Sequence, residues 1–251
     1  MVSPRFAREG SHLLLSGRGG TGLFVADRDG ALHVIDSTYR GPVRLDVAER
    51  TVCLPNRETI STPRSLPKGL RVVGARACPP VPFDPETGQV LRDGASGRWI
   101  HRPLRGELQF RPPGGRTVVV DDRVPWSIRV SPDGRRVAYC VGSLPDQTLY
   151  LWDEARGRRS LGTGVHPVFH PDGLLIYSRP EGVAHVGKFT TVARAELRAH
   201  DLATGASWDL TATPDIAEMQ PALSPDGSRL AFADWRWGGV YQAAFGHRGQ
   251  R

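Results

Sequence analysis

A turn motif that recurs three times predicts an all-β fold, a single small β-propeller. The motif reads Ser-Pro-Asp-Gly, with His in place of Ser in one copy, and its copies begin at Ser131, His170 and Ser224. An apolar stretch precedes each copy, and a stretch with apolar residues at alternate positions follows it, as expected of two short strands. The 29 glycines and 21 prolines are spread along the whole chain, which indicates frequent turns and not one long linker.

Each residue of the motif has a mechanical role in a tight turn. Proline fixes φ, the aspartate side chain accepts hydrogen bonds from nearby backbone N–H groups, and glycine adopts a positive φ that other residues resist. The motif therefore predicts a hairpin between the first two strands of a blade. The interval between the first two copies suits one four-stranded blade, and the longer second interval suits a blade with an insertion.

Weaker copies and further strand pairs extend the repeat over the rest of the chain. We divide the chain into six approximate blades of four strands: 1–40, 41–93, 94–124, 125–164, 165–214 and 215–251. A five-blade alternative stays open, because residues 41–124 also fit one long, irregular blade. The last unit has room for about three strands. We therefore expect a strand from the N-terminus to close the ring and remove an exposed sheet edge.

These repeats resemble the TolB-like and PD40 repeats, which are related in architecture to WD40 propellers. The resemblance is specific in the blades that start near Pro125, Val165 and Asp215, fair in 1–38, and poor in 39–124. It implies a role in protein–protein interaction. TolB proteins are exported, whereas the sequence given shows neither an export signal nor an additional N-terminal domain, so we do not expect a role in the Tol system.

Composition argues against several other classes of protein. The formal net charge is +7, but only Lys68 and Lys188 are lysines and the arginines form no long run, so we expect no nucleic-acid partner. Cys53, Cys78 and Cys140 lack metal-ligand spacing and are expected to be free thiols in a reducing compartment. No apolar run is long enough for a signal peptide or a membrane span, which predicts a cytoplasmic protein. We expect neither a cofactor nor a metal.

The place of the motif in a blade locates a first group of candidate residues. If the motif forms the lower turn of a blade, the first strand of that blade starts at the upper mouth of the central channel. Counting back four residues from each copy gives Ser127, His166 and Gln220. We expect Glu218 near the same mouth and Arg129 pointing inward.

The sharpest local feature is a loop that ends in glycines and holds two tryptophans around an arginine. Exposed Trp and Arg side chains are favoured anchors of interfaces, because they bury much area and supply directional donors. A second upper loop carries further basic residues. We expect the binding surface to consist of Trp235, Arg236, Trp237, Arg179, His185 and Lys188.

Two functions are compatible with these residues. The first is a non-enzymatic scaffold that binds a protein or peptide on the upper face through the loop residues. The second is a small-molecule-binding protein or enzyme with its pocket in the upper channel, where His166 acts as general base or polarising group. In that case Ser127, Arg129, Glu218 and Gln220 orient the substrate. The sequence contains no nucleophile elbow and no paired carboxylates whose spacing fixes an acid–base role, which favours the scaffold.

Overall fold

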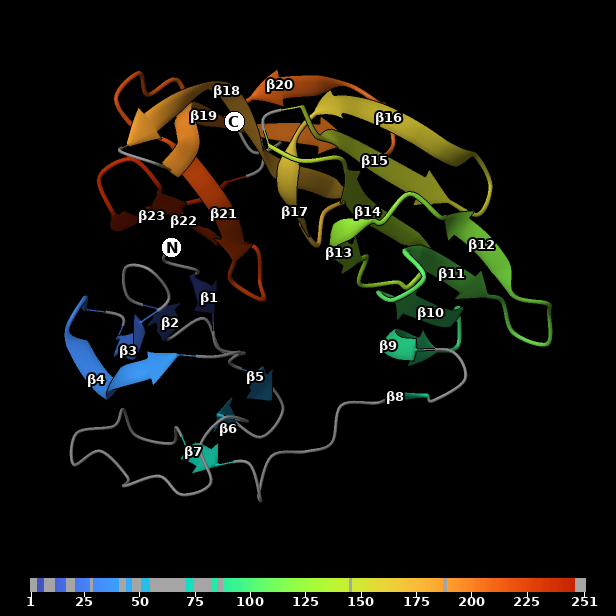
Figure 1. The fold of residues 1–251 in the computed structure, drawn as a ribbon, viewed down its shortest axis with the longest axis horizontal. Coiled ribbons are helices and arrows are strands. Elements are labelled where there is room, and N and C mark those ends of the chain that lie inside the picture. Colours follow the sequence, from blue (N-terminus) through green and yellow to red (C-terminus); the bar gives the residue numbers. More distant parts are fainter. Residues whose placement is uncertain are drawn as a thin grey trace. The chain divides into compact units, whose positions relative to one another are not determined.

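A computed structural model describes residues 4–6, 12–16, 21–27, 29–40, 44–46, 51–54, 71–74, 83–84, 88–144, 146–186 and 189–246. The regular structure of these residues consists of β-strands, without a helix among them (Figure 1). Within the described ranges there is accordingly no helix that could cross a membrane. The chain divides into two compact units, residues 1–79 with 220–251, and residues 80–219.

In the first unit, residues 1–79 with 220–251, the described strands form three sheets. One sheet holds β1 (Arg5–Phe6), β2 (Leu13–Ser16), β3 (Thr21–Ala26) and β4 (Leu32–Arg40), in that order. A smaller sheet holds β5 (Arg44–Asp46), β6 (Thr51–Leu54) and β7 (Arg71–Gly74), and its strands β6 and β7 run parallel. The last sheet holds β21 (Glu218–Leu223), β22 (Arg229–Asp234) and β23 (Gly239–Ala244).

In the second unit, residues 80–219, the described strands also form three sheets, each of antiparallel strands. The first holds β8 (Phe83–Asp84), β9 (Gly88–Gly94), β10 (Gly97–Arg102), β11 (Glu107–Arg111) and β12 (Val118–Asp121). The second holds β13 (Trp126–Val130), β14 (Arg136–Val141), β15 (Thr148–Asp153) and β16 (Gly157–Thr163). The third holds β17 (Val165–Phe169), β18 (Leu174–Val186), β19 (Phe189–Asp201) and β20 (Ser207–Asp209).

The recurring motif forms the predicted hairpin in all three copies. In the first copy the N–H of Ser131 donates to the carbonyl of Arg136 at 2.9 Å, and the N–H of Gly134 donates to the carbonyl of Ser131 at 2.9 Å. Gly134 has a φ of 74°, which explains the need for glycine. The copy at Ser224 makes the same pair of backbone hydrogen bonds, and in the copy at His170 the N–H of His170 donates to the carbonyl of Leu174, four residues on instead of five. The motif therefore joins the first two strands of a sheet each time it occurs.

The sheet β1–β4 has two apolar faces, because its side chains point alternately to opposite sides. One face packs against β6 in a buried core of Leu14, Leu23, Val25, Ile35, Val52 and Leu54. The other face packs against the sheet β21–β23 in a smaller core, in which Leu13 and Ala231 are buried. This second face is only partly covered, and the uncovered part forms the site described below.

The strand pairing confirms the predicted all-β fold of mainly antiparallel sheets, three of which have four strands among the described residues. The strand β9 belongs to the same sheet as β10, although the expected blade boundary at residue 94 separates them. Among the described residues β1 pairs with β2, and the last sheet has three strands. Closure of the ring by an N-terminal strand therefore stays a prediction, as does the number of blades.

Candidate functional site

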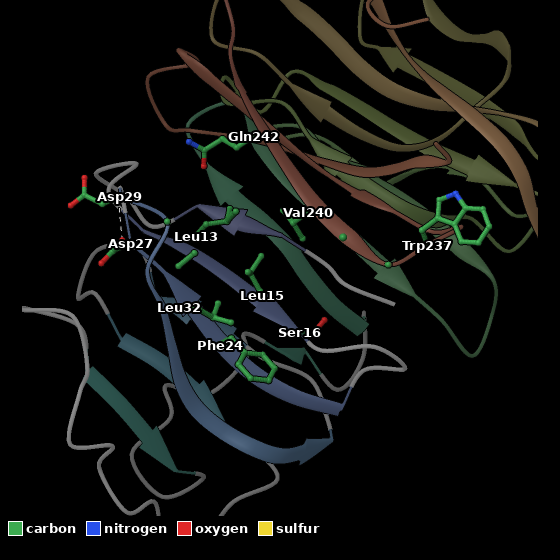
Figure 2. A pocket seen from close by; sticks show the side chains of 14 residues that line it. Leu13, Leu15, Ser16, Phe24, Asp27, Asp29, Leu32, Trp237, Val240 and Gln242 are labelled. Atoms are coloured by element: carbon green, nitrogen blue, oxygen red, sulfur yellow. Dashed lines mark hydrogen bonds between the residues drawn. The ribbon is translucent and has the colours of Figure 1, made fainter. Parts of the chain in front are cut away.

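A groove of about 740 Å³ lies in the first unit, between the partly covered face of the sheet β1–β4 and the strand β23 (Figure 2). Its floor and walls are mainly apolar and include Leu13, Leu15, Phe24, Leu32 and Val240. Figure 2 shows Asp27 and Asp29 at the end of the groove near Gln242, and Trp237 at the opposite end. The groove thus combines an apolar middle with polar or aromatic groups at its two ends.

The register of the strands explains the apolar floor. Leu13 pairs with Ala26, and Ala26 pairs in turn with Leu32, so the three side chains share one face of the sheet. Leu13 is buried, but Leu32 is 58% exposed and Val34, which shares its face, is 47% exposed. The cover supplied by β21–β23 therefore ends before it reaches β4.

The loop Trp235–Gly238 joins β22 to β23 and forms one end of the groove. The carboxylate of Asp234 accepts a hydrogen bond from the N–H of Arg236 at 2.8 Å, and its carbonyl accepts one from Gly238 at 3.2 Å. These bonds hold the turn and leave Trp237 68% exposed. The guanidinium carbon of Arg236 lies 5.0 Å from the centre of the Trp237 ring, a cation–π arrangement. The sequence prediction singled out this loop, and the structure places Trp237 at the groove.

The other end of the groove is acidic. A carboxylate oxygen of Asp27 lies 3.3 Å from His33 Nε2, and the same carboxylate accepts hydrogen bonds from the N–H groups of Asp29 and Ala31 at 3.0 and 2.8 Å. The bond to His33, followed by these backbone bonds, lowers the pKa of Asp27. Asp27 is therefore negative at neutral pH, beside the exposed Asp29.

The remaining residues of the predicted binding surface belong to the second unit. Arg179 is paired with Glu181 at 2.7 Å and with Asp209 at 3.5 Å, which neutralises its charge within β18 and β20. The backbone of His185 pairs with Thr190 in the β18–β19 hairpin. The side chain of His185 and the whole of Lys188 lie outside the described residues. Trp235 is half-buried and contributes less surface than Trp237.

The three positions counted back from the motif share an unusual backbone conformation. Ser127, His166 and Gln220 have φ values of 50°, 52° and 55°, in the left-handed region that favours glycine. Strand pairing shifts register at Ser127 and at His166, so each residue sits in a bulge of the first strand. Such a conformation costs about 1–3 kcal/mol for a residue with a side chain, so the surroundings must enforce it.

His166 is neutral at physiological pH. Burial, with a smaller effect from the positive charge of Arg129, lowers its pKa to about 4. Its ring makes an edge contact with Trp126, with 6.3 Å between the centres. An adjacent carboxylate would raise the pKa and tune the imidazole for proton transfer near pH 7. The lowered pKa instead makes His166 a weak base, which does not favour the predicted general-base role.

Glu218 is held by a hydrogen-bond network inside the second unit. Its carboxylate accepts hydrogen bonds from the Leu197 N–H at 3.1 Å, from the Thr213 hydroxyl at 2.7 Å, and from the Thr211 hydroxyl. Burial raises the pKa of Glu218 even though these donors oppose the rise. The network holds Glu218, which belongs to the second unit, against β19, so Glu218 has a structural role beside any role toward a substrate.

Among the described residues of the second unit, the other chemistry-bearing groups do not assemble a reaction centre. Cys140 is buried with its Sγ 3.5 Å from the carbonyl of Gly164, and burial raises the pKa of its thiol to about 12. A thiol with such a pKa is a poor nucleophile at pH 7. Among the described residues, no group of three or more His, Cys, Asp or Glu side chains is placed to hold a metal ion.

The sequence interpretation found one end of the groove and missed the rest. The loop at one end stood out in the sequence because two tryptophans flank an arginine there. The acidic turn Asp27–Gly30 was visible as well, but nothing in the sequence joined two segments that lie about 200 residues apart in the chain. The expectation that the last unit has room for about three strands was the available signal, because a sheet that lacks an outer strand leaves its neighbour partly uncovered.

No known family model matches the chain, and no curated protein matches it. Solved structures do match. A gluconolactonase from Xanthomonas campestris aligns over 96% of this chain and 84% of its own, with a TM-score of 0.54 and 16% identity. TolB from Acinetobacter baumannii aligns over 96% of this chain, with a TM-score of 0.39 and 14% identity, and this chain spans 51% of its length. Hydrazine synthase from Kuenenia stuttgartiensis aligns over 92% of this chain and 73% of its own, with a TM-score of 0.45 and 14% identity. These likenesses concern the fold alone, and of the three only the gluconolactonase match has a TM-score above 0.5. Together with the repeated turn and the mainly antiparallel sheets, that match supports a β-propeller fold.

Proposed function

We propose that this chain is a non-enzymatic binding protein that holds a segment of a partner protein in the groove between the sheet β1–β4 and β23. The observation that carries the proposal is the exposure of Trp237 at the end of an apolar groove of about 740 Å³. Large aromatic and arginine side chains at such positions supply most of the energy of many interfaces. The volume is also within the range of known ligand sites.

The surface chemistry supports binding more than catalysis. Trp237, Leu32 and Val34 are large apolar side chains exposed on one unit, and their burial by a partner is favourable. The candidate catalytic group, His166, has a lowered pKa, and the carboxylate of Glu218 is engaged by three donors. A groove lined in this way needs a complementary surface and no reacting group.

Affinity capture from the native lysate tests this function. Bait proteins carrying Trp237→Ala or Leu32→Ser are compared with the unchanged protein and with Leu104→Ser, since Leu104 is fully exposed and lies in the other unit. We expect one protein to be captured by the unchanged bait and by Leu104→Ser, and to be lost from the two groove variants. Capture that is equal on all four baits would show that the groove is not the binding site.

A second function, a small-molecule pocket at Ser127 and His166, is supported by the left-handed backbone that these two residues share. Strained backbone at corresponding positions is often kept where a ligand is bound. Mass spectrometry of small molecules that co-purify with the native protein tests this alternative. A compound retained by the unchanged protein and lost from His166→Asn would support it.

A further inference from the structure

The strand β23 has a free outer edge among the described residues. The N–H of Phe245 donates to the carbonyl of Ser228 at 2.7 Å, which fixes the alternation of the ladder between β22 and β23. In an antiparallel pair every second residue exchanges hydrogen bonds with its partner strand, and the residues between them direct both backbone groups outward. Val240, Gln242 and Ala244 are the outward-directed residues of β23. Their N–H and C=O groups therefore form a template for one more strand.

The groove lies where that additional strand would run. Its side wall is β23, and its floor is the part of the sheet β1–β4 that carries Phe24 and Leu32 (Figure 2). Val34 is the cross-strand partner of Phe24 and lies on the same face of the sheet, beside the groove. A strand paired with β23 would point alternate side chains onto this floor. It would cover Leu32 and Val34, the two apolar side chains that β21–β23 leave exposed.

Three other sheets of the chain have an antiparallel fourth strand, which the sheet β21–β23 lacks among the described residues. β4 pairs antiparallel with β3, β16 with β15, and β20 with β19, so each of these sheets has an antiparallel fourth strand. The sheet β21–β23 ends at β23 in the described part of the chain. The same edge that receives a fourth strand in the other sheets is thus available here.

The antiparallel direction and the charges at the two ends of the groove together define the charge pattern of the incoming strand. β23 runs from the end marked by Trp237 toward the end marked by Asp27 and Asp29 (Figure 2). A strand antiparallel to β23 would begin at the acidic end and finish beside Arg236. Opposite charges across an interface fix register and orientation. The groove therefore matches a segment that is basic at its N-terminal end, acidic at its C-terminal end, and apolar at alternate positions between.

We propose that a segment of a partner protein with this charge pattern binds as a fourth antiparallel strand on β23. The backbone pairs with Val240, Gln242 and Ala244, and the apolar side chains fill the groove over Leu32 and Val34. The inference rests on the proposed binding function and adds to it the mode of binding and the chemistry of the partner. Strand addition of this kind takes its affinity from backbone hydrogen bonds and its specificity from alternate side chains.

Two synthetic peptides of identical composition test the direction of the strand. Both are capped and match the length of β23, with one charged residue added at each end and valine alternating with threonine between. One has lysine first and glutamate last, and the other has the reverse order. Fluorescence anisotropy with the whole chain should give an affinity about threefold or more higher for the lysine-first peptide, because each end forms an ion pair. Equal affinity of the two peptides, or binding of neither, would overturn the inference.

A proline substitution tests whether the backbone edge is used. Gln242→Pro removes an outward N–H without removing a hydrogen bond to β22, whereas Gln242→Ala removes the side chain and keeps the N–H. We expect Gln242→Pro to weaken binding of the lysine-first peptide about tenfold and Gln242→Ala to leave it within about twofold. Circular dichroism confirms that both variants are folded. Equal affinities of the two variants would mean that the groove binds without strand addition, so the proposed function would survive while this inference fails.

Two other occupants of the edge are excluded by further measurements. Deletion of residues 1–3 or of residues 247–251 should leave the affinity for the peptide unchanged, whereas a marked increase in either variant would identify the chain itself as the occupant. Sedimentation is measured at increasing protein concentration for the unchanged protein and for Gln242→Pro. We expect that the unchanged protein forms no dimer that is lost in the variant. Such a dimer would identify a second copy of the chain as the strand donor and would overturn the assignment to a partner protein.

Discussion

The indole N–H of Trp99 donates a hydrogen bond of 2.7 Å to the carbonyl of Gly134. Trp99 lies in β10, and Gly134 is the turn glycine of the motif in the following sheet. The side chain is fully buried, with ring centres 4.6 Å from Phe110 and 5.1 Å from Trp152. The turn at Ser131–Gly134 forms because of its own four residues, and the hydrogen bond from Trp99 also attaches it to the preceding sheet.

This bond gives the first prediction, which concerns stability. Trp99→Phe removes the donor, leaves the carbonyl of Gly134 buried, and leaves space in the core, so we expect a loss of about 2 kcal/mol in the free energy of unfolding. Trp126→Phe is the matched control, because the indole of Trp126 donates to the carbonyl of Gly142 at the same 2.7 Å in an exposed position. Urea unfolding should show a loss of less than about 1 kcal/mol for the control. Equal losses of unfolding free energy in the two variants would show that the buried hydrogen bond of Trp99 stabilises the protein no more than the exposed hydrogen bond of Trp126.

Asp121 gives a prediction about acid stability. Burial would raise the pKa of this carboxyl, but the hydrogen bonds from Arg123 and Tyr139 outweigh burial and lower it to about 2. Arg158 lies 3.1 Å away and adds a further ion pair. Since the pKa is depressed in the folded state, the stabilisation is present at neutral pH and is lost as the pH falls from about 4 to about 2.

The expected size of this effect is about 2 kcal/mol, and unfolding curves recorded across that pH range measure it. Asp121→Asn should lower stability at pH 7 and should flatten the pH dependence between about pH 4 and pH 2. A variant that keeps the full acid dependence would show that another carboxylate is responsible.

His166 gives a prediction with a different pH window. Burial, and to a smaller extent Arg129, lower its pKa from 6.5 to about 4, so the folded state resists protonation. Stability is therefore complete above about pH 6.5 and decreases as the pH falls toward 4, by about 3 kcal/mol. His166→Asn should remove this dependence, and asparagine tolerates the positive φ at this position.

Nuclear magnetic resonance titration of the His166 ring checks the cause of that shift. Arg129→Gln removes the neighbouring positive charge and should raise the pKa of His166, although burial should keep it below its ordinary value. An unchanged pKa in this variant would mean that burial alone produces the shift.

The motif at Ser224 gives a prediction about local hydrogen bonding. The Ser224 hydroxyl donates to Asp226 and accepts from the N–H of Arg229 at 2.9 Å in a buried position. This hydroxyl is the largest cause of the lowered pKa of Asp226, which is about 2. Ser224→Ala should raise the pKa of Asp226 and reduce stability by about 1–2 kcal/mol, because the N–H of Arg229 loses its acceptor.

Ser228→Ala is the comparison for that change. Its hydroxyl also donates to Asp226, at 2.8 Å, but in an exposed position. We expect a smaller rise in the pKa of Asp226 and a loss of stability of less than about 0.5 kcal/mol. Titration of the Asp226 carboxyl measures both pKa values. A larger rise in the pKa of Asp226 for Ser228→Ala than for Ser224→Ala would contradict the conclusion that the Ser224 hydroxyl is the main cause of the lowered pKa.

The turn chemistry was readable in the sequence because each motif residue acts within its own turn. Proline, aspartate and glycine determine local geometry with little help from distant residues, as the copy at Ser131 shows. The positions of Ser127, His166 and Gln220 could be counted from the motif, but their left-handed backbone could not be foreseen. A non-glycine residue adopts that conformation only when tertiary packing enforces it.

The candidate site was less predictable for a related reason. Trp237 stood out by its type, whereas Leu32 read as an ordinary strand residue and Asp27 as an ordinary turn residue. Their common role depends on which sheet covers which face, and this is a property of packing between distant segments. The lowered pKa of His166 depended likewise on burial that no spacing rule revealed.

The first unit is built from two segments that are far apart in the chain, residues 1–79 and 220–251, and this has a consequence for folding during synthesis on the ribosome. Leu13 near the start of the chain shares a small core with Ala231 near its end, whereas residues 80–219 form a unit of their own. Elongation proceeds at about 5–20 residues per second, so β22 is synthesised on the order of ten seconds or more after β2. The apolar face of β2 stays without its packing partner during that time. The middle of the chain can fold during that time, and the first strands cannot complete their packing until the last have been made. A circular permutant that begins at residue 80 should therefore need less help from chaperones than the natural order of segments.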